Sequence, residues 1–166
     1  MISRRNAFWL GIAGSGAMLA QFSPALAADC RPQDQAAVAG SALLDRYVAA
    51  VNAHDTSAFS EMFTEAYIQH SGRSASGLAA QVENFVRIFK SMPDIQMRVE
   101  DRIIAGDKVV ARNTFTATHT QTIRDIPPTG KTFSFRTIDI WRVEGGKFAE
   151  HWDLTDTAEV LSKLRG

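Results

Sequence analysis

Three ionisable side chains near the end of the chain have the types and spacing needed for proton transfer. Asp139 precedes His151 by twelve residues, and Asp153 follows His151 at a spacing of two. Alternate residues of a β-strand point to one face of a sheet, so His151 and Asp153 share a face. A carboxyl group beside apolar walls, a second carboxyl and an imidazole can take up and return a proton. We therefore expect Asp153 to exchange the proton, with His151 and Asp139 tuning its protonation; the alternative is a buried polar network without chemistry.

The hairpin that precedes His151 decides whether these groups meet. If Glu144-Gly145-Gly146 is a three-residue loop closed by a left-handed glycine, Val143 faces Lys147. That register puts Asp139 opposite His151 and Thr137 opposite Asp153, on a face shared with Phe133, Phe135, Trp141 and Ala149. If the loop is only Gly145-Gly146, Asp139 opposes Trp152 and the cluster separates. We favour the three-residue loop.

Further side chains are candidates for lining the same cavity. His70 and His119 lie on predicted strands and could point into it, although each is also compatible with a core or rim position. His70, His119, His151 and Asp153 follow no recognised zinc spacing, so we expect no metal and no other cofactor. The residues expected to contact a substrate are His70, His119, Thr137, Trp141, Phe135 and Tyr67.

Helices come first and strands follow, in the elements expected to position these residues. Apolar residues at helical spacing predict helices over residues 34–52, 55–63 and 78–92, with a short extended piece at 66–70 between the last two. Alternation and turn residues predict strands over 95–104, 108–120, 132–143 and 147–154, before a final helix from 156. This order predicts an α+β fold in which the helices pack on one face of a curved antiparallel sheet.

Length, composition and charge define the class of protein. The chain has 166 residues, of which 45% are hydrophobic and 22% charged, as in an ordinary globular domain. Its 18 basic and 18 acidic side chains balance, which gives no electrostatic basis for binding nucleic acid.

The first 27 residues have the layout of an export signal. Arg4 and Arg5 precede an uncharged stretch rich in Gly and Ala, and Ala25-Leu26-Ala27 is a small-residue cleavage site. The paired arginines favour the twin-arginine route, with Sec export as the alternative. We therefore expect a periplasmic or extracellular protein with no membrane attachment after cleavage, a short extension over 28–40 and one domain over 41–166. Cys30 is the only cysteine, so an intrachain disulfide is excluded.

Five short motifs together resemble the SnoaL-like polyketide cyclases, also called ester cyclases, of the nuclear-transport-factor-2-like superfamily. They are Tyr67-Ile68-Gln69-His70, Gly106-Asp107-Lys108-Val109-Val110, Pro127-Pro128-Thr129-Gly130-Lys131, Asp139-Ile140-Trp141-Arg142 and Gly146-Lys147-Phe148-Ala149-Glu150-His151-Trp152-Asp153. The resemblance implies a cone-shaped sheet wrapped around the helices, and it matches Asp153 to the acid/base residue of those cyclases. His151 and His119 match two of their histidines. Thr137 and Asp139 stand where those cyclases carry Gln and His, so their substrate is not implied.

Two functions from different classes are compatible with these features. The first is a cofactor-independent acid/base enzyme that acts on a hydrophobic carbonyl compound by aldol-type cyclisation, isomerisation or a related proton transfer. The second is a periplasmic small-molecule binding module, in which Asp153 only orients the ligand. A structural dimerisation domain is a third possibility. We also expect a homodimer, because Ile138, Ile140, Phe148, Trp152 and Leu154 are predicted on the outer sheet face.

Overall fold

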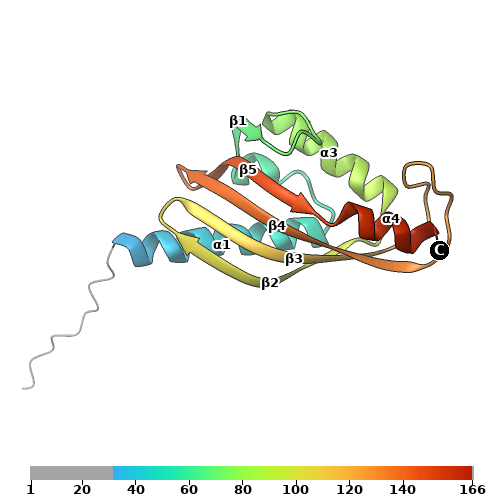
Figure 1. Ribbon diagram of the computed structural model, residues 1–166. Helices are drawn as coiled ribbons and strands as arrows, with labels where there is room; N and C mark the ends of the chain where they lie inside the picture. The colour runs from blue at the N-terminus through green and yellow to red at the C-terminus, as the bar shows by residue number, and fades with distance from the viewer. Residues whose placement is uncertain (1–31, 166) are drawn as a thin grey trace, which may run out of the picture.

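Helices precede long strands along the chain, in the predicted order (Figure 1). The computed structural model describes residues 32–165. In chain order the elements are α1 (Pro32–Asn52), α2 (Phe59–Met62), β1 (Phe63–Gln69), α3 (Leu78–Ser91), β2 (Gln96–Ala105), β3 (Lys108–Thr118), β4 (Thr132–Glu144), β5 (Lys147–Thr155) and α4 (Thr157–Arg165). The predicted export signal, its cleavage site and Cys30 lie outside these residues. Within 32–165, no helix is long and apolar enough to cross a membrane.

All five strands form one curved sheet in the order β1-β5-β4-β3-β2. The predicted α+β fold, with helices against one face of this sheet, is confirmed (Figure 1). One strand departs from the expected antiparallel pattern, because β1 pairs parallel with β5. Parallel pairing is open to β1 because α3 and three further strands intervene before the chain returns to its side, whereas tight hairpins join β2 to β3 and β4 to β5.

The core between helices and sheet is built around the ring of Tyr47 on α1. Its ring centroid lies 5.7–6.2 Å from five other aromatic rings, most of them meeting it edge to face. These rings belong to Phe59, Phe63, Phe85, Trp141 and Phe148. They join α1, α2, β1, α3, β4 and β5, and burying each contributes about 2–3 kcal/mol. This aromatic cluster fixes the helices against the strands that carry Asp139 and His151.

The hairpin between β4 and β5 differs from the prediction. Glu144 pairs with Lys147, so the loop is the two-residue turn Gly145-Gly146, with both φ angles positive at 57° and 77°. The three-residue loop was therefore wrong, and so was the pairing of Asp139 with His151. A bulge at Ala149 then adds one residue to β5, which shifts the register so that Asp139 pairs with Asp153.

The bulge returns the side chains that follow it on β5 to the sheet faces that were predicted for them. The two-residue turn alone would have placed each of them on the opposite face. Beyond the bulge, Trp141 pairs with His151 and Thr137 pairs with Thr155. His151 and Asp153 consequently face the helices together with Asp139, although their cross-strand partners are not those expected. The same bulge places Phe148 on the inner face, fully buried against Trp141, where the sequence analysis had put it on the outer face.

The left-handed turn gives a test of this hairpin. We expect Gly145→Val to lower the free energy of unfolding by roughly 1–2 kcal/mol, because a β-branched residue resists positive φ. Gly145→Asn should cost much less, since Asn-Gly is a preferred pair in such turns. Urea denaturation of the two variants measures the difference. Equal stability of the Val and Asn variants would contradict a left-handed residue at this position.

The outer face of the sheet leaves several large apolar side chains in contact with solvent. Leu154 is 76% exposed, Ile103 63%, Ile138 50% and Ile68 42%. Val110, Ile140 and Trp152 lie in the row that continues from Ile103 across β3, β4 and β5. We propose that a second copy of this chain covers the face by a two-fold sheet-to-sheet contact.

Light scattering tests this contact. We expect a dimer at tens of micromolar, on the order of the concentrations at which weak homodimers assemble. Leu154→Glu should give a monomer, because the contact would bury an unpaired carboxylate. A parent protein that is monomeric at that concentration, or a Leu154→Glu variant that still dimerises, would contradict the proposal.

Candidate active site

A cavity of about 810 Å³ lies between the sheet, α3 and α4. Its volume is in the range of small-molecule sites. Phe115 and Phe135 stack with ring centroids 4.9 Å apart and, with Phe133, form an aromatic wall. Ile88 of α3, Met92 directly after that helix, and Val160 and Leu161 of α4 close the cavity from the helical side. Asp139, His151 and Asp153 line the same cavity, so three ionisable side chains lie beside its apolar walls.

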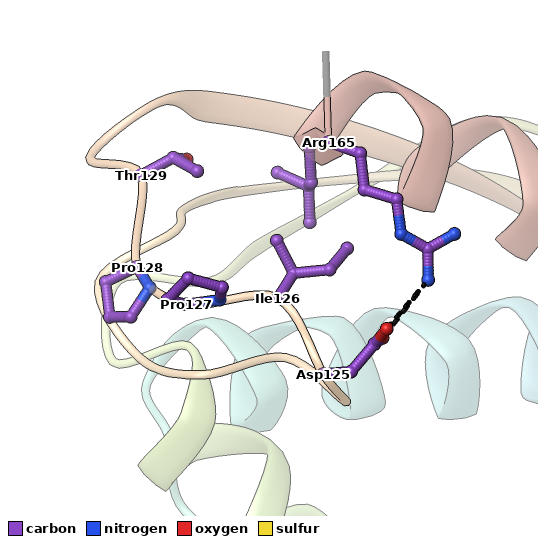
Figure 2. Close-up of a pocket in the computed structure, with 7 residues that line it drawn as sticks. Asp125, Ile126, Pro127, Pro128, Thr129 and Arg165 are labelled. Atoms are coloured by element: carbon purple, nitrogen blue, oxygen red, sulfur yellow. Dashed lines mark hydrogen bonds and ion pairs between the residues drawn. The ribbon is translucent and has the colours of Figure 1, made fainter.

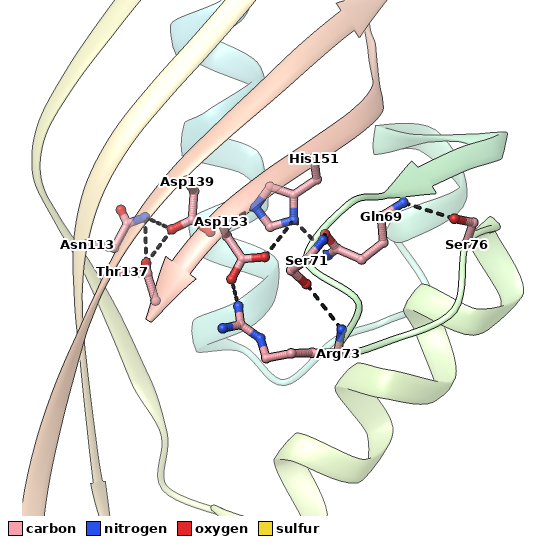
Figure 3. A network of polar contacts seen from close by, with 9 residues as sticks. All are labelled: Gln69, Ser71, Arg73, Ser76, Asn113, Thr137, Asp139, His151 and Asp153. Carbon is pink, nitrogen blue, oxygen red and sulfur yellow. Dashed lines mark hydrogen bonds and ion pairs between the residues drawn. The ribbon is translucent and has the colours of Figure 1, made fainter. Parts of the chain in front are cut away.

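Asp139 is the centre of a polar network on this wall (Figure 3). Its side chain is 9% exposed, and its carboxylate accepts three hydrogen bonds. Oδ2 accepts from Asn113 Nδ2 at 2.7 Å and from the Thr137 hydroxyl, while Oδ1 accepts from His151 Nε2 at 2.8 Å. Three donors compensate the cost of burying this carboxylate, so Asp139 can orient His151.

Gln69 fixes which nitrogen of His151 carries the ring proton. The backbone N–H of Ser71 donates to Gln69 Oε1 at 3.1 Å, so the other end of that amide, Nε2, faces His151 Nδ1 at 2.9 Å. An amide nitrogen can only donate, so Nδ1 must accept and carries no proton. The single ring proton lies on Nε2 and is donated to Asp139. The network therefore holds the His151 ring in one orientation and one tautomer.

Asp153 differs from Asp139 because one of its carboxylate oxygens has no hydrogen-bond donor among the described residues. Its side chain is only 5% exposed, and its Oδ2 forms an ion pair with the guanidinium of Arg73. Oδ1 is buried without a hydrogen-bond partner in the described part of the chain, 4.0 Å from His151 Nδ1. A buried carboxylate oxygen with no donor, on a residue that lines a cavity, can accept a hydrogen bond from a molecule that reaches it. Asp153 is thus the carboxyl group of this wall that can receive a proton from a ligand.

Two tyrosines near the network do not compete for that role. Burial raises the pKa of Tyr47 well above its usual value, and the nearby negative charge of Asp139 raises it further. Burial, with a contribution from Asp139, also raises the pKa of Tyr67. Both phenols therefore stay protonated near neutral pH, so neither can act as the base.

The other residues predicted to contact substrate fall into different places. Phe135 and Thr137 line the cavity. Trp141 is fully buried and stacks on His151, with ring centroids 4.9 Å apart, and so supports the imidazole from the side. Tyr67 is also fully buried, and its ring lies 6.5 Å from that of His151. Both rings pack beside His151 instead of on the cavity wall.

His70 and His119, the two histidines predicted to contact substrate, do not line the cavity. His70 was expected to point inward, but its ring stacks on Trp152 at 4.4 Å and its Nε2 contacts Glu150 at 2.8 Å, on the outer face. It shares that face with Ile68, whose exposure gives the same assignment. His119 is fully buried and its Nδ1 contacts the Thr129 hydroxyl at 3.0 Å, so it anchors the loop that contains the two prolines.

Sequence reasoning missed four polar residues of the site. The sequence does contain a signal for Asn113. It is a polar residue at an inward position of β3, between the buried residues Val109, Ala111, Phe115 and Ala117. Gln69 likewise shares the face of Tyr67, opposite to Ile68. Gln81 takes an inward position of α3 and is 3% exposed, with its Oε1 unpartnered among the described residues. Arg73 lies between β1 and α3, where no periodic pattern indicates its direction.

A second, smaller hollow of about 310 Å³ lies between the Pro127-Pro128 loop and the end of α4 (Figure 2). Its charged groups are Asp125 and Arg165, which pair with each other at 3.1 Å. It offers no group comparable to Asp153. Within residues 32–165, no three His, Cys, Asp or Glu side chains are grouped so as to hold a metal ion.

Comparisons with known proteins agree with the fold and with the predicted resemblance. The family model described as SnoaL-like polyketide cyclase matches residues 41–164. Among solved structures, TsrD from Streptomyces laurentii is 29% identical, with a TM-score of 0.71 over 78% of this chain and 96% of its own. AclR from Streptomyces galilaeus is also 29% identical, with a TM-score of 0.70 over 77% and 85%.

A third structure, IdmH from Streptomyces antibioticus, is 23% identical and supports the fold, with a TM-score of 0.68 over 76% of this chain and 99% of its own. The comparison with curated proteins found no matching sequence. The family model covers most of the chain, and the solved structures share its sheet and helices over most of their length. The chain therefore belongs to the SnoaL-like polyketide cyclase family.

Proposed function

We propose that this protein is a cofactor-independent acid/base enzyme that acts on a hydrophobic carbonyl compound. The observation that carries the proposal is the buried Oδ1 of Asp153, which has no hydrogen-bond partner within residues 32–165 and belongs to a residue that lines a largely apolar cavity. A carboxylate in that position can remove a proton from the carbon next to a carbonyl group and return it elsewhere on the same molecule. Aldol-type cyclisation and isomerisation both begin with this step.

The neighbouring groups support that role in distinct ways. Asp139 and Gln69 hold the His151 ring, and Trp141 stacks against it. Nδ1 of His151 lies 4.0 Å from Asp153 Oδ1, so the ring lies beside the proposed base without forming a hydrogen bond to it.

The aromatic wall of the cavity is the reason for proposing a hydrophobic ligand. Phe115, Phe133 and Phe135 offer flat apolar faces to a ring system or an unsaturated chain. Excluding water from such a chamber strengthens the electrostatic interactions of Asp153 with a ligand. We further propose that the enzyme works outside the cytoplasm, on the strength of its first 27 residues.

Proton exchange tests the function without knowledge of the natural substrate. Hydrophobic methyl ketones, first screened by thermal shift, are incubated with the protein in D₂O, and loss of the α-proton signal is followed by NMR. The proposal expects exchange well above the buffer rate for at least one ketone that binds. If ketones bind in the cavity and none exchanges faster than in buffer, the protein is a binding module and the enzyme proposal is wrong.

A further inference from the structure

Arg73 brings a positive charge into the cavity beside the proposed base. It lies in the segment that joins β1 to α3, and its side chain is 45% exposed while that of Asp153 is 5% exposed. Figure 3 shows its guanidinium reaching from the segment toward the end of the Asp153 side chain. The contact is on Oδ2, so Arg73 leaves Oδ1 without a hydrogen-bond partner among the described residues.

The charges around the cavity single out this arginine. Asp139 and Asp153 are the acidic residues of its lining, and Arg73, Arg87 and Arg124 are the basic ones. Asp139 accepts hydrogen bonds from three donors, one of them His151, and the other ring nitrogen of His151 faces Gln69. Arg87 contacts Asn84 on its own helix at 3.3 Å. Arg73 is therefore the cation in direct contact with the carboxyl group proposed to change its charge.

We propose that Arg73 stabilises the oxygen anion formed on the substrate when Asp153 takes its proton. This inference rests on the proposed function. The C–H bond next to the carbonyl breaks, an O–H bond forms at Asp153 Oδ1, and the electron pair moves to the carbonyl oxygen. One negative charge thus passes from Asp153 to the enolate oxygen, while the charge of Arg73 is unchanged.

The charge balance of the site explains why Arg73 would interact with the enolate oxygen. Before the transfer, Arg73 and the Asp153 carboxylate compensate each other. After it, Asp153 is neutral, and the positive charge of Arg73 is left to interact with the new anion on the substrate. Donors that are already present and aimed at developing charge lower the barrier without reorganisation. A guanidinium has five N–H donors, so it can bind the new oxygen without fully leaving Asp153.

A binding experiment tests this directly, with no need for the natural substrate. The probes are 2-naphthoate, an oxygen anion on a flat apolar body, and 2-acetylnaphthalene, its neutral ketone counterpart. Asp153→Asn removes the charge that occupies Arg73, so the free guanidinium should bind the carboxylate. We expect at least about a tenfold gain in affinity for 2-naphthoate, the effect of roughly one charge-assisted hydrogen bond. Affinity for 2-acetylnaphthalene should change by less than about threefold on the same scale.

The double variant Arg73→Gln/Asp153→Asn isolates the contribution of Arg73. It should lose the gain in 2-naphthoate affinity completely. Arg112→Gln is the matched control, because it removes an exposed arginine that pairs with Asp101 on the outer face, and it should leave both affinities at parental values. Asp153→Ala repeats the measurement with a second neutral side chain, and circular dichroism checks that each variant is folded.

Each outcome decides the role of Arg73 separately from the function. The inference is overturned if neither neutral variant of Asp153 gains affinity for 2-naphthoate, or if the gain persists without Arg73. In the exchange assay, Arg73→Gln should slow α-proton exchange by roughly ten- to a hundredfold, and Arg73→Lys should recover part of the rate. Parental exchange in Arg73→Gln, with exchange lost in Asp153→Asn, would overturn the inference and leave the proposed function standing. Conversely, absence of exchange in the parent protein would remove the function and, with it, the enolate role.

Discussion

Asp153→Asn is expected to lower the rate of α-proton exchange by roughly two to four orders of magnitude, the usual contribution of a general acid/base group. The substitution keeps the size and hydrogen-bonding shape of the side chain but removes its ability to accept a proton. Because the neutral ketone makes no ionic contact with Asp153, its affinity should stay close to the parental value. The measurement compares exchange rate and dissociation constant for the same ketone in the two proteins.

A control separates loss of the base from a general effect of altering a carboxyl group. Asp156→Asn changes a carboxyl three residues away that pairs with Arg136 outside the cavity, so exchange should continue near the parental rate. Parental exchange in Asp153→Asn would exclude Asp153 as the base. Equal loss in both variants would point to the stability of the C-terminal region instead of to chemistry.

Asp139→Asn is expected to lower the free energy of unfolding by about 2–3 kcal/mol. Asp139 accepts all three of its hydrogen bonds, whereas the NH₂ group of an asparagine can only donate. The new amide would place its two hydrogens against either the Nε2–H of His151 or the donors of Asn113 and Thr137. His151 cannot simply move its proton to Nδ1, because the Nε2 amide group of Gln69 already donates there. At least one buried donor is left without an acceptor, and urea denaturation measures the cost.

Asp101→Asn provides the comparison for Asp139→Asn. Asp101 is also a strand carboxylate paired with a cation, Arg112, but its side chain is 61% exposed. Water replaces the lost contact there, so the change in unfolding free energy should stay below about 1 kcal/mol. Similar values for the two variants would show that the Asp139 network contributes no more than an ordinary surface pair.

The fold could be predicted from sequence because its elements have strong periodic signals. The amphipathic pattern of α3 and the alternation of β3 are carried by buried residues, so each gives the element and its inward face together. The shared face of Asp139, His151 and Asp153 was predicted for the wrong reason. The short Gly145-Gly146 turn and the bulge at Ala149 each shift the alternation by one residue, and the two shifts cancel.

Other features of the site lie outside what one sequence indicates. A bulge has no composition of its own, and Ala149 resembles any small strand residue. Arg73 follows Gly72 in a connection without periodicity, so its contact with Asp153 depends on how β1 and α3 are placed around it. His70 and Gln69 show the opposite case. Alternation with the buried Tyr67 would have placed Gln69 inward and His70 outward, had β1 been assigned an inner face.

A crystal structure with a bound methyl ketone tests the central claim most directly. The account predicts that the ketone occupies the cavity along Phe115 and Phe135, with its α-carbon about 3–3.5 Å from Asp153 Oδ1, the separation of a reactive complex. The carbonyl oxygen should face the Arg73 guanidinium. A ketone bound in the cavity with Asp153 Oδ1 still out of contact, or bound only in the hollow beside Pro127, would contradict the assignment of Asp153 as the base.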